Sequence, residues 1–156
     1  MHSPTKAQSN LKAVIEKEII NIKAIPTNSH PDIQGKLDSV TVFDSSYSKI
    51  VSLGVKAIPV LFKWLYDTSY TPVKNPCWEE EPMRVHDIAW FLINEIEPIQ
   101  EYYALKIVMC TWDQCSHFPQ GFFNFIHSRP IIFATRYKKY FYSNQRKLIL
   151  RGKIPK

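Results

Sequence analysis

Apolar side chains recur every three or four residues along most of this chain, which is the spacing that places them on one face of an α-helix. Leu11, Ile15, Ile19 and Ile22 form the first such stripe. Pro26 follows, and a proline disfavours helical backbone at the residue before it. The pattern therefore predicts an amphipathic helix that ends before Pro26.

The segment 44–65 predicts two short helices that are separated by a glycine. Asp44 begins a helix-start signal, and Gly54 can close the first helix in the left-handed conformation. Pro59 is tolerated because it falls in the first turn of the second helix. The residues that these two helices are expected to bury are Tyr47, Ile50, Val51, Ile58, Leu61, Phe62 and Leu65.

Further helices are expected in the second half of the chain. Three glutamates at 79–81 follow a Pro-rich linker over 71–76, and their charge suits the positive end of a helix dipole. They predict a helix start there, with an apolar stripe that continues to Ile96. The segment 102–112 is apolar almost all round, which is typical of a central buried helix.

Two segments allow alternative structures. Residues 32–43 are compatible with a helix or with a short strand. The aromatic content of 136–142 also suits a strand, but helical spacing favours a helix of about four or five turns there. Another short helix is expected to precede it within 118–128, and residues 151–156 are expected to form a loose basic tail.

The stretch from Ile50 to Leu61 resembles the inner turn of a HEAT-like helical repeat, in which a short helix ends at Gly and an Ala-Ile-Pro-x-Leu segment opens the next. Arg84, Ala89 and Leu92 are similar to the start of a following repeat. The linker over 68–82 is longer than the usual turn of the family. The resemblance therefore covers about 45–96, with one clear repeat and one degenerate repeat.

This resemblance and the helical stripes together predict an all-α fold. We expect a HEAT-like right-handed stack of antiparallel helix pairs, about five to eight helices in number. The length of 156 residues suits a single domain, which we place at 1–150, with the HEAT-like centre at 45–96 and basic aromatic helices over 118–150. The resemblance to small bacterial HEAT-like proteins implies a binding module with a concave surface.

The charge of the chain is one-sided. The net charge is +6, yet the first 113 residues hold 11 basic and 14 acidic residues, a net charge of −3. From Gln114 to Lys156 there are nine basic residues and no acidic residue. Such asymmetry indicates an acidic partner. The expected partner-binding residues are Arg129, Arg136, Lys138, Lys139, Arg146, Lys147 and, as an interface anchor in the charged linker, Trp78.

No catalytic or metal-binding set is expected from the sequence. Four residues have zinc-ligand chemistry, but their spacing differs from that of the familiar zinc sites. These residues are Cys110, Cys115, His117 and His127. His86 and Asp87 are adjacent, and adjacent helical residues face different directions. Because no nucleophile, base and orienting group can be assembled, we expect no enzyme activity, no metal and no cofactor.

The function that these features favour is a non-catalytic bacterial protein-interaction module, and most concretely an immunity-type inhibitor that binds and neutralises a toxin. The alternative is a nucleic-acid-binding helical repeat protein that uses the basic C-terminal face, because cations neutralise phosphates and aromatic rings stack on bases. Three cysteines, no signal peptide and no apolar run long enough to span a membrane favour a cytoplasmic protein with no membrane partner.

Overall fold

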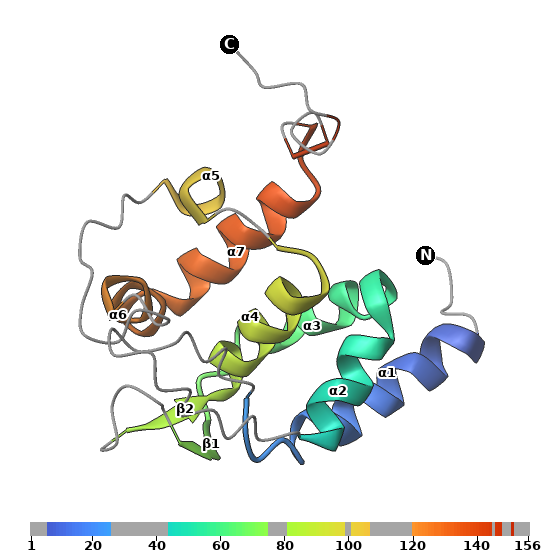
Figure 1. Ribbon diagram of the computed structural model, residues 1–156. Coiled ribbons are helices and arrows are strands. Elements are labelled where there is room, and N and C mark those ends of the chain that lie inside the picture. Colours follow the sequence, from blue (N-terminus) through green and yellow to red (C-terminus); the bar gives the residue numbers. More distant parts are fainter. Residues whose placement is uncertain are drawn as a thin grey trace, which may run out of the picture.

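The computed structural model describes residues 6–25, 44–74, 81–98, 101–106, 120–144, 146–147 and 151. Its α-helices are α1 (Lys6–Ile19), α2 (Ser45–Ser52), α3 (Ile58–Trp64), α4 (Val85–Ile96), α5 (Glu101–Leu105), α6 (Gln120–Ser128) and α7 (Pro130–Phe141). A 3-10 turn η1 (Gly54–Lys56) and two strands, β1 (Tyr70–Lys74) and β2 (Pro82–Arg84), complete the described elements. This part of the chain is therefore mostly helical, as the sequence predicts, with one small sheet (Figure 1).

Helix α1 ends at Ile19, earlier than the predicted end before Pro26, and the buried stripe continues beyond the helix to Ile22. A single carboxylate links this following segment to α2. Ile15, Ile19 and Ile22 are all buried. Asp44 is the N-cap of α2, and its Oδ1 accepts the backbone N–H of Tyr47 at 2.9 Å. Its Oδ2 accepts the backbone N–H of Lys23 at 2.8 Å. The Asp44 side chain thus caps α2 and also accepts a backbone N–H from the segment that follows α1.

The predicted pair of short helices is confirmed. Gly54 has φ +62°, so it takes the left-handed conformation that the sequence suggested, and it also begins η1. Pro59 lies in the first turn of α3. Of the seven residues expected to point inward, Val51 is only partly buried, and the other six are buried: Tyr47, Ile50, Ile58, Leu61, Phe62 and Leu65.

The prediction that 71–76 is a linker and that a helix starts at 79–81 is wrong. Strands β1 and β2 pair antiparallel, with Tyr70 opposite Arg84. Helix α4 begins only at Val85, and Glu81, which is exposed, precedes β2. The physical reason is an alternating burial pattern: Val73 on β1 and Met83 on β2 point into the core. The alternation of buried and exposed residues extends over only a few positions, and the prolines within these strands favoured the interpretation as a linker.

The helices of the C-terminal third are shorter than predicted. Helix α5 ends at Leu105, and Lys106 follows with φ +59°, a left-handed conformation that does not continue a helix. Helix α7 has 12 residues and ends at Phe141. The strand alternative for 136–142 is therefore wrong, and the helical interpretation is confirmed. The segment 32–43, the residues 107–112 and nearly all of the expected tail lie outside the described residues.

Aromatic side chains join the C-terminal helices to the rest of the molecule. Trp90 of α4 lies 4.7 Å from Phe122 of α6, measured between ring centroids. Phe62 of α3 meets Phe141 of α7 edge to face at 5.0 Å. These residues belong to one hydrophobic core that also includes residues of α1 and α2. In Figure 1, α5, α6 and α7 accordingly lie together on one side of α3 and α4. Within the described residues, every helix is too short or too polar to traverse a lipid bilayer.

Candidate functional site

The outward side of α7 combines two exposed lysines with exposed apolar side chains. Lys138 and Lys139 are exposed, and neither has a side-chain hydrogen bond or ion pair with another described residue. Ile131, 70% exposed, lies two turns before Lys138 on the same side of the helix, and Ile132 bears the same relation to Lys139. Tyr142, 52% exposed, follows one turn after Lys138. We call these five residues the α7 face.

Other predicted partner-binding residues take part in contacts within the protein. Arg136 donates from Nη1 to the backbone oxygen of Leu105 at 3.1 Å, which links α7 to α5. Arg146 pairs with Glu97, donates to the backbone oxygen of Phe141 at 2.9 Å and stacks over the Phe141 ring. Burial lowers the pKa of Arg146 below its usual value. These two guanidinium groups therefore hold helices in place rather than present a free cation.

Of the remaining predicted partner-binding residues, two are exposed and one lies outside the described part of the chain. Arg129 is exposed at the N-cap of α7, and Lys147 is exposed beyond its end. Trp78 lies outside the described residues. Sequence reasoning missed the apolar members of the α7 face. The helical spacing could have revealed them, because Ile131 and Ile132 lie on a different side of α7 from the aromatic residues that the helix buries.

The aromatic residues of α7 face the core and not the solvent. Phe133 and Tyr137 have no exposed surface, and Tyr140 retains only 7%. Tyr103 of α5 stacks on Tyr140, and Phe133 meets Phe122 of α6 at right angles. These rings are therefore not available to stack on the bases of a nucleic acid.

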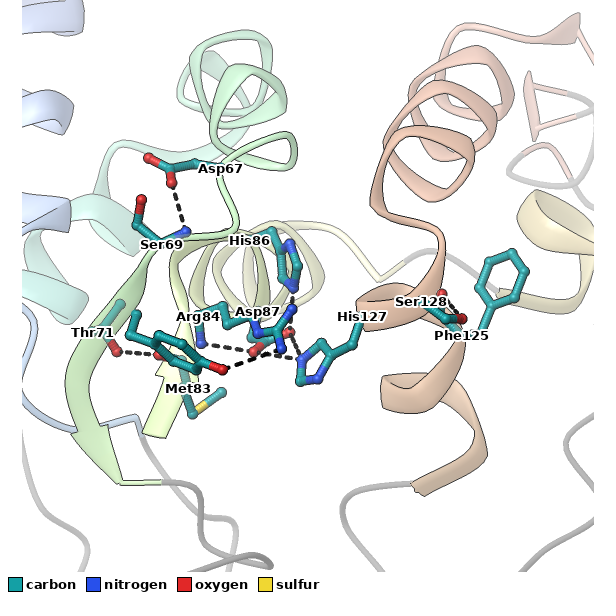
Figure 2. Close-up of polar contacts among 11 residues, drawn as sticks. Asp67, Ser69, Thr71, Met83, Arg84, His86, Asp87, Phe125, His127 and Ser128 are labelled. Atoms are coloured by element: carbon teal, nitrogen blue, oxygen red, sulfur yellow. Dashed lines mark hydrogen bonds and ion pairs between the residues drawn. The ribbon is translucent and has the colours of Figure 1, made fainter. Parts of the chain in front are cut away.

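A second constellation lies where the first turn of α4 meets the last turn of α6. His86 and Asp87 come from α4 and have no exposed surface, whereas the side chain of His127, from α6, is 15% exposed. Figure 2 shows the rings of His86 and His127 both directed toward the carboxylate of Asp87. His127 Nε2 lies 3.0 Å from Asp87 Oδ1 and 3.1 Å from Oδ2, and His86 Nε2 lies 3.3 Å from Oδ1.

Backbone contacts fix the start of α4, and with it the position of Asp87. Asp87 Oδ2 accepts the backbone N–H of Arg84 at 2.8 Å, so the carboxylate caps the helix to which it belongs. The N–H groups of Val85 and His86 donate to the backbone oxygens of Ser69 and Asp67, each at 2.9 Å. The first donors of the helix are therefore satisfied by the segment that connects α3 to β1, which anchors the site to that segment.

Asp87 is held as a carboxylate in spite of its burial. Burial by itself raises the pKa of a carboxyl group, but the contacts with His127, His86 and the Arg84 amide outweigh this effect. The pKa of Asp87 is therefore lowered from its usual value. The result is a negatively charged group in the interior that two imidazole rings face.

Among the residues that the structure describes, His86, Asp87 and His127 form a group with the chemistry to hold a metal. Each offers one ligand atom, and these atoms lie within 4.8 Å of one another. The expectation that His86 and Asp87 face different directions is wrong, because the His86 ring lies close enough to share the Asp87 carboxylate. The residues with which His127 was considered as a zinc ligand, Cys110, Cys115 and His117, lie outside the described residues.

Comparison with known proteins matches the chain to no family model, to no curated protein and to no solved structure. The function of the chain therefore has to be argued from its own residues.

Proposed function

We propose that this chain is a non-catalytic protein-binding module that docks an acidic protein on the α7 face. The observation that carries the proposal is the pairing of exposed apolar and cationic side chains on one side of a helix, with Ile131 and Tyr142 flanking Lys138. Large exposed apolar groups contribute binding energy when a partner covers them. Adjacent lysines speed the encounter with an acidic surface and select for it.

The charge of the chain supports an acidic partner. No aspartate or glutamate occurs after position 113, so no acidic residue of α6 or α7 neutralises Lys138 and Lys139. A binding surface of this kind presents an unbalanced positive potential to its surroundings.

A protein partner fits the α7 face better than a nucleic acid does. Binding to single strands uses several exposed rings on which successive bases stack, but the rings of Phe133, Tyr137 and Tyr140 are buried, which leaves Tyr142 as the one exposed ring of the α7 face. Two isoleucines exposed beside the lysines offer no contact to phosphate. They do suit the apolar centre of a protein interface with a charged rim.

The more specific form of the proposal is an immunity-type inhibitor that neutralises a bacterial toxin, built on a HEAT-like stack. The turn at Gly54 between α2 and α3 supports the HEAT-like part of this proposal. The hairpin of β1 and β2 between α3 and α4 departs from a stack made of helices alone. The proposed docking on α7 depends on the side chains of that helix and not on this resemblance.

Affinity capture with a charge-reversed variant tests the proposal. Wild type and the double variant Lys138→Glu/Lys139→Glu are immobilised, exposed to lysate of the native host at low and at moderate salt, and the retained proteins are identified by mass spectrometry. Each candidate with an acidic surface is then purified and titrated against both chains by calorimetry. We expect saturable binding to wild type and a loss of at least about tenfold in the double variant, because two opposed charges are introduced at the interface.

The matched control is Lys23→Glu/Lys56→Glu, which makes the same change of net charge at two exposed lysines outside α7. This control should bind like wild type. Equal weakening in both double variants, or no purified partner that binds wild type, would contradict docking on the α7 face. Binding of DNA or RNA that falls steeply with salt and is lost in the α7 variant would replace the proposal with the nucleic-acid alternative. Rescue of growth against a captured toxin would test the immunity role.

A further inference from the structure

We propose that His86, Asp87 and His127 form a site for a divalent transition-metal ion, with Zn²⁺ as its representative, and that the ion joins α4 to α6. This site is separate from the α7 face, and the proposal does not depend on the proposed function. It rests on the geometry of the three side chains and on a buried histidine without hydrogen-bond partners.

Two of the three distances between ligand atoms are close to those of an occupied site, and all three atoms lie within 4.8 Å of one another. Two atoms that bind one zinc ion tetrahedrally at about 2.0–2.1 Å lie about 3.3 Å apart. Asp87 Oδ1 lies 3.0 Å from His127 Nε2 and 3.3 Å from His86 Nε2. The imidazole rings of the two histidines are 5.3 Å apart between centroids, so both can turn a nitrogen toward one ion beside the carboxylate (Figure 2).

His86 supplies independent support because its ring is buried without hydrogen-bond partners. The residue has no exposed surface, and neither Nδ1 nor Nε2 makes a hydrogen bond of acceptable geometry. A buried polar atom without a partner destabilises the folded state. Nε2 nevertheless lies 3.3 Å from the Asp87 carboxylate, at the distance of a fellow ligand. An ion bound to its lone pair would remove part of this destabilisation.

The carboxylate between the two rings requires a positive charge nearby. Asp87 has no exposed surface, and a buried carboxylate is stable only when it is paired with or coordinated to a cation. The guanidinium of Arg84 is turned to Tyr70, with its carbon 5.2 Å from the centre of that ring and Nη2 3.4 Å from Oη. Among the described contacts it makes no ion pair with Asp87. A metal ion held between the two imidazole rings would supply a cation that no lysine or arginine contact of Asp87 provides among the described residues.

The donor set selects the class of ion. Imidazole nitrogens favour zinc and its transition-metal neighbours, whereas calcium and magnesium prefer oxygen ligands throughout. The three side chains leave coordination positions for water or for a ligand from elsewhere. His127 is partly exposed while the other two residues are buried, so an ion would enter from the side of α6.

Metal titration of the purified full-length chain tests the site. The protein is stripped with a chelator, and Co²⁺ and Zn²⁺ are then added while Co²⁺ absorption and the melting temperature are followed. We expect one ion per chain, the absorption of a site with nitrogen and oxygen ligands, and a melting temperature that rises with metal concentration. The variant His127→Gln should weaken binding by more than about 100-fold, since loss of an outer-shell partner alone costs up to that factor.

Two further variants keep the test decisive. Asn124→Gln changes an exposed residue of the same helix α6 and should bind metal like wild type. Asp87→Asn retains an oxygen that can cap Arg84, so α4 can still form, and it should also lose the metal. If His127→Gln fails to fold, Asp87→Asn and the wild-type stoichiometry decide the question.

The competing arrangement is a cluster held by hydrogen bonds alone, in which imidazole N–H groups donate to the Asp87 carboxylate and no ion is bound. That arrangement predicts no saturable binding of Co²⁺ or Zn²⁺ to wild type, or equal affinity in wild type and His127→Gln. Either result would overturn the metal site. Neither result would affect the capture experiment on the α7 face, because the two measurements use different residues and different probes.

Discussion

Asp87 and His127 meet across two helices although 40 positions separate them in the sequence: His127 Nε2 lies 3.0 Å from one carboxylate oxygen and 3.1 Å from the other. The same carboxylate caps the helix that carries it, by accepting the Arg84 amide. One side chain therefore defines where α4 begins and also holds α6 against it. The stability of the contact can be tested apart from any metal.

The variant Asp87→Asn is expected to lower the free energy of unfolding at neutral pH. It is also expected to make that free energy less dependent on pH in the acidic range. The pKa of Asp87 is lowered in the folded state, so its ionised form stabilises the fold above the unfolded value of about 3.9, and this contribution is lost as pH falls through the folded pKa. Urea unfolding in the presence of a chelator should give a loss of about 1.5–3 kcal/mol at pH 7, typical of hydrogen bonds to a charged group. The difference between the two proteins should shrink as the pH falls below the unfolded value of about 3.9. A constant difference at all pH values would contradict this role of the charge.

Asp44→Ala is expected to cost about 1–2 kcal/mol, the upper range for loss of a helix cap. The variant removes the acceptor for Tyr47 and also the acceptor for Lys23, which binds the other carboxylate oxygen. Asp44→Asn is the matched comparison, because its single amide oxygen can accept from one of these donors but not from both. Urea unfolding at pH 7 should therefore rank wild type, Asp44→Asn and Asp44→Ala in descending stability. Equal stability of Ala and wild type would mean that water satisfies both donors.

Gly54→Ala is expected to destabilise the protein by about 1–2 kcal/mol through the backbone alone. Gly54 has φ +62°, and a Cβ at this position would meet no atom within 4 Å, so steric contact adds nothing. Gly54→Asn should cost less, because asparagine tolerates the left-handed conformation better than alanine. Thermal unfolding followed by circular dichroism measures both variants. If alanine proved no worse than asparagine, the left-handed backbone would not be the source of the cost.

Phe122→Ala is expected to cost about 3–5 kcal/mol, the range for deletion of a buried aromatic ring. The Phe122 ring has no exposed surface and contacts Trp90 of α4 and Phe133 of α7, so its removal opens a cavity between three helices. Phe125→Ala on the same helix is the control, since Phe125 is only partly buried and should cost less. Chemical denaturation compares the two. Similar losses would indicate that α6 contributes to stability through its own helix formation and not through this junction.

The sequence allowed most helices to be predicted because their signals are local. A stripe such as Ile15, Ile19 and Ile22 specifies which side of a helix is buried whatever it packs against, and the conformation of Gly54 follows from its missing Cβ. The hairpin at 70–84 was missed for a related reason. Its strands are too short for a two-residue period to stand out, and their pairing with each other decides their structure.

The charge asymmetry and the inward residues of the helices were thus determined by the sequence alone. The tertiary structure decided which of the predicted cations stay free: Arg136 and Arg146 are used within the fold, whereas Lys138 and Lys139 remain exposed. It also decided that His127 meets Asp87. Each of these outcomes depends on which helix packs against which, and long-range packing leaves no period in the local order of residues.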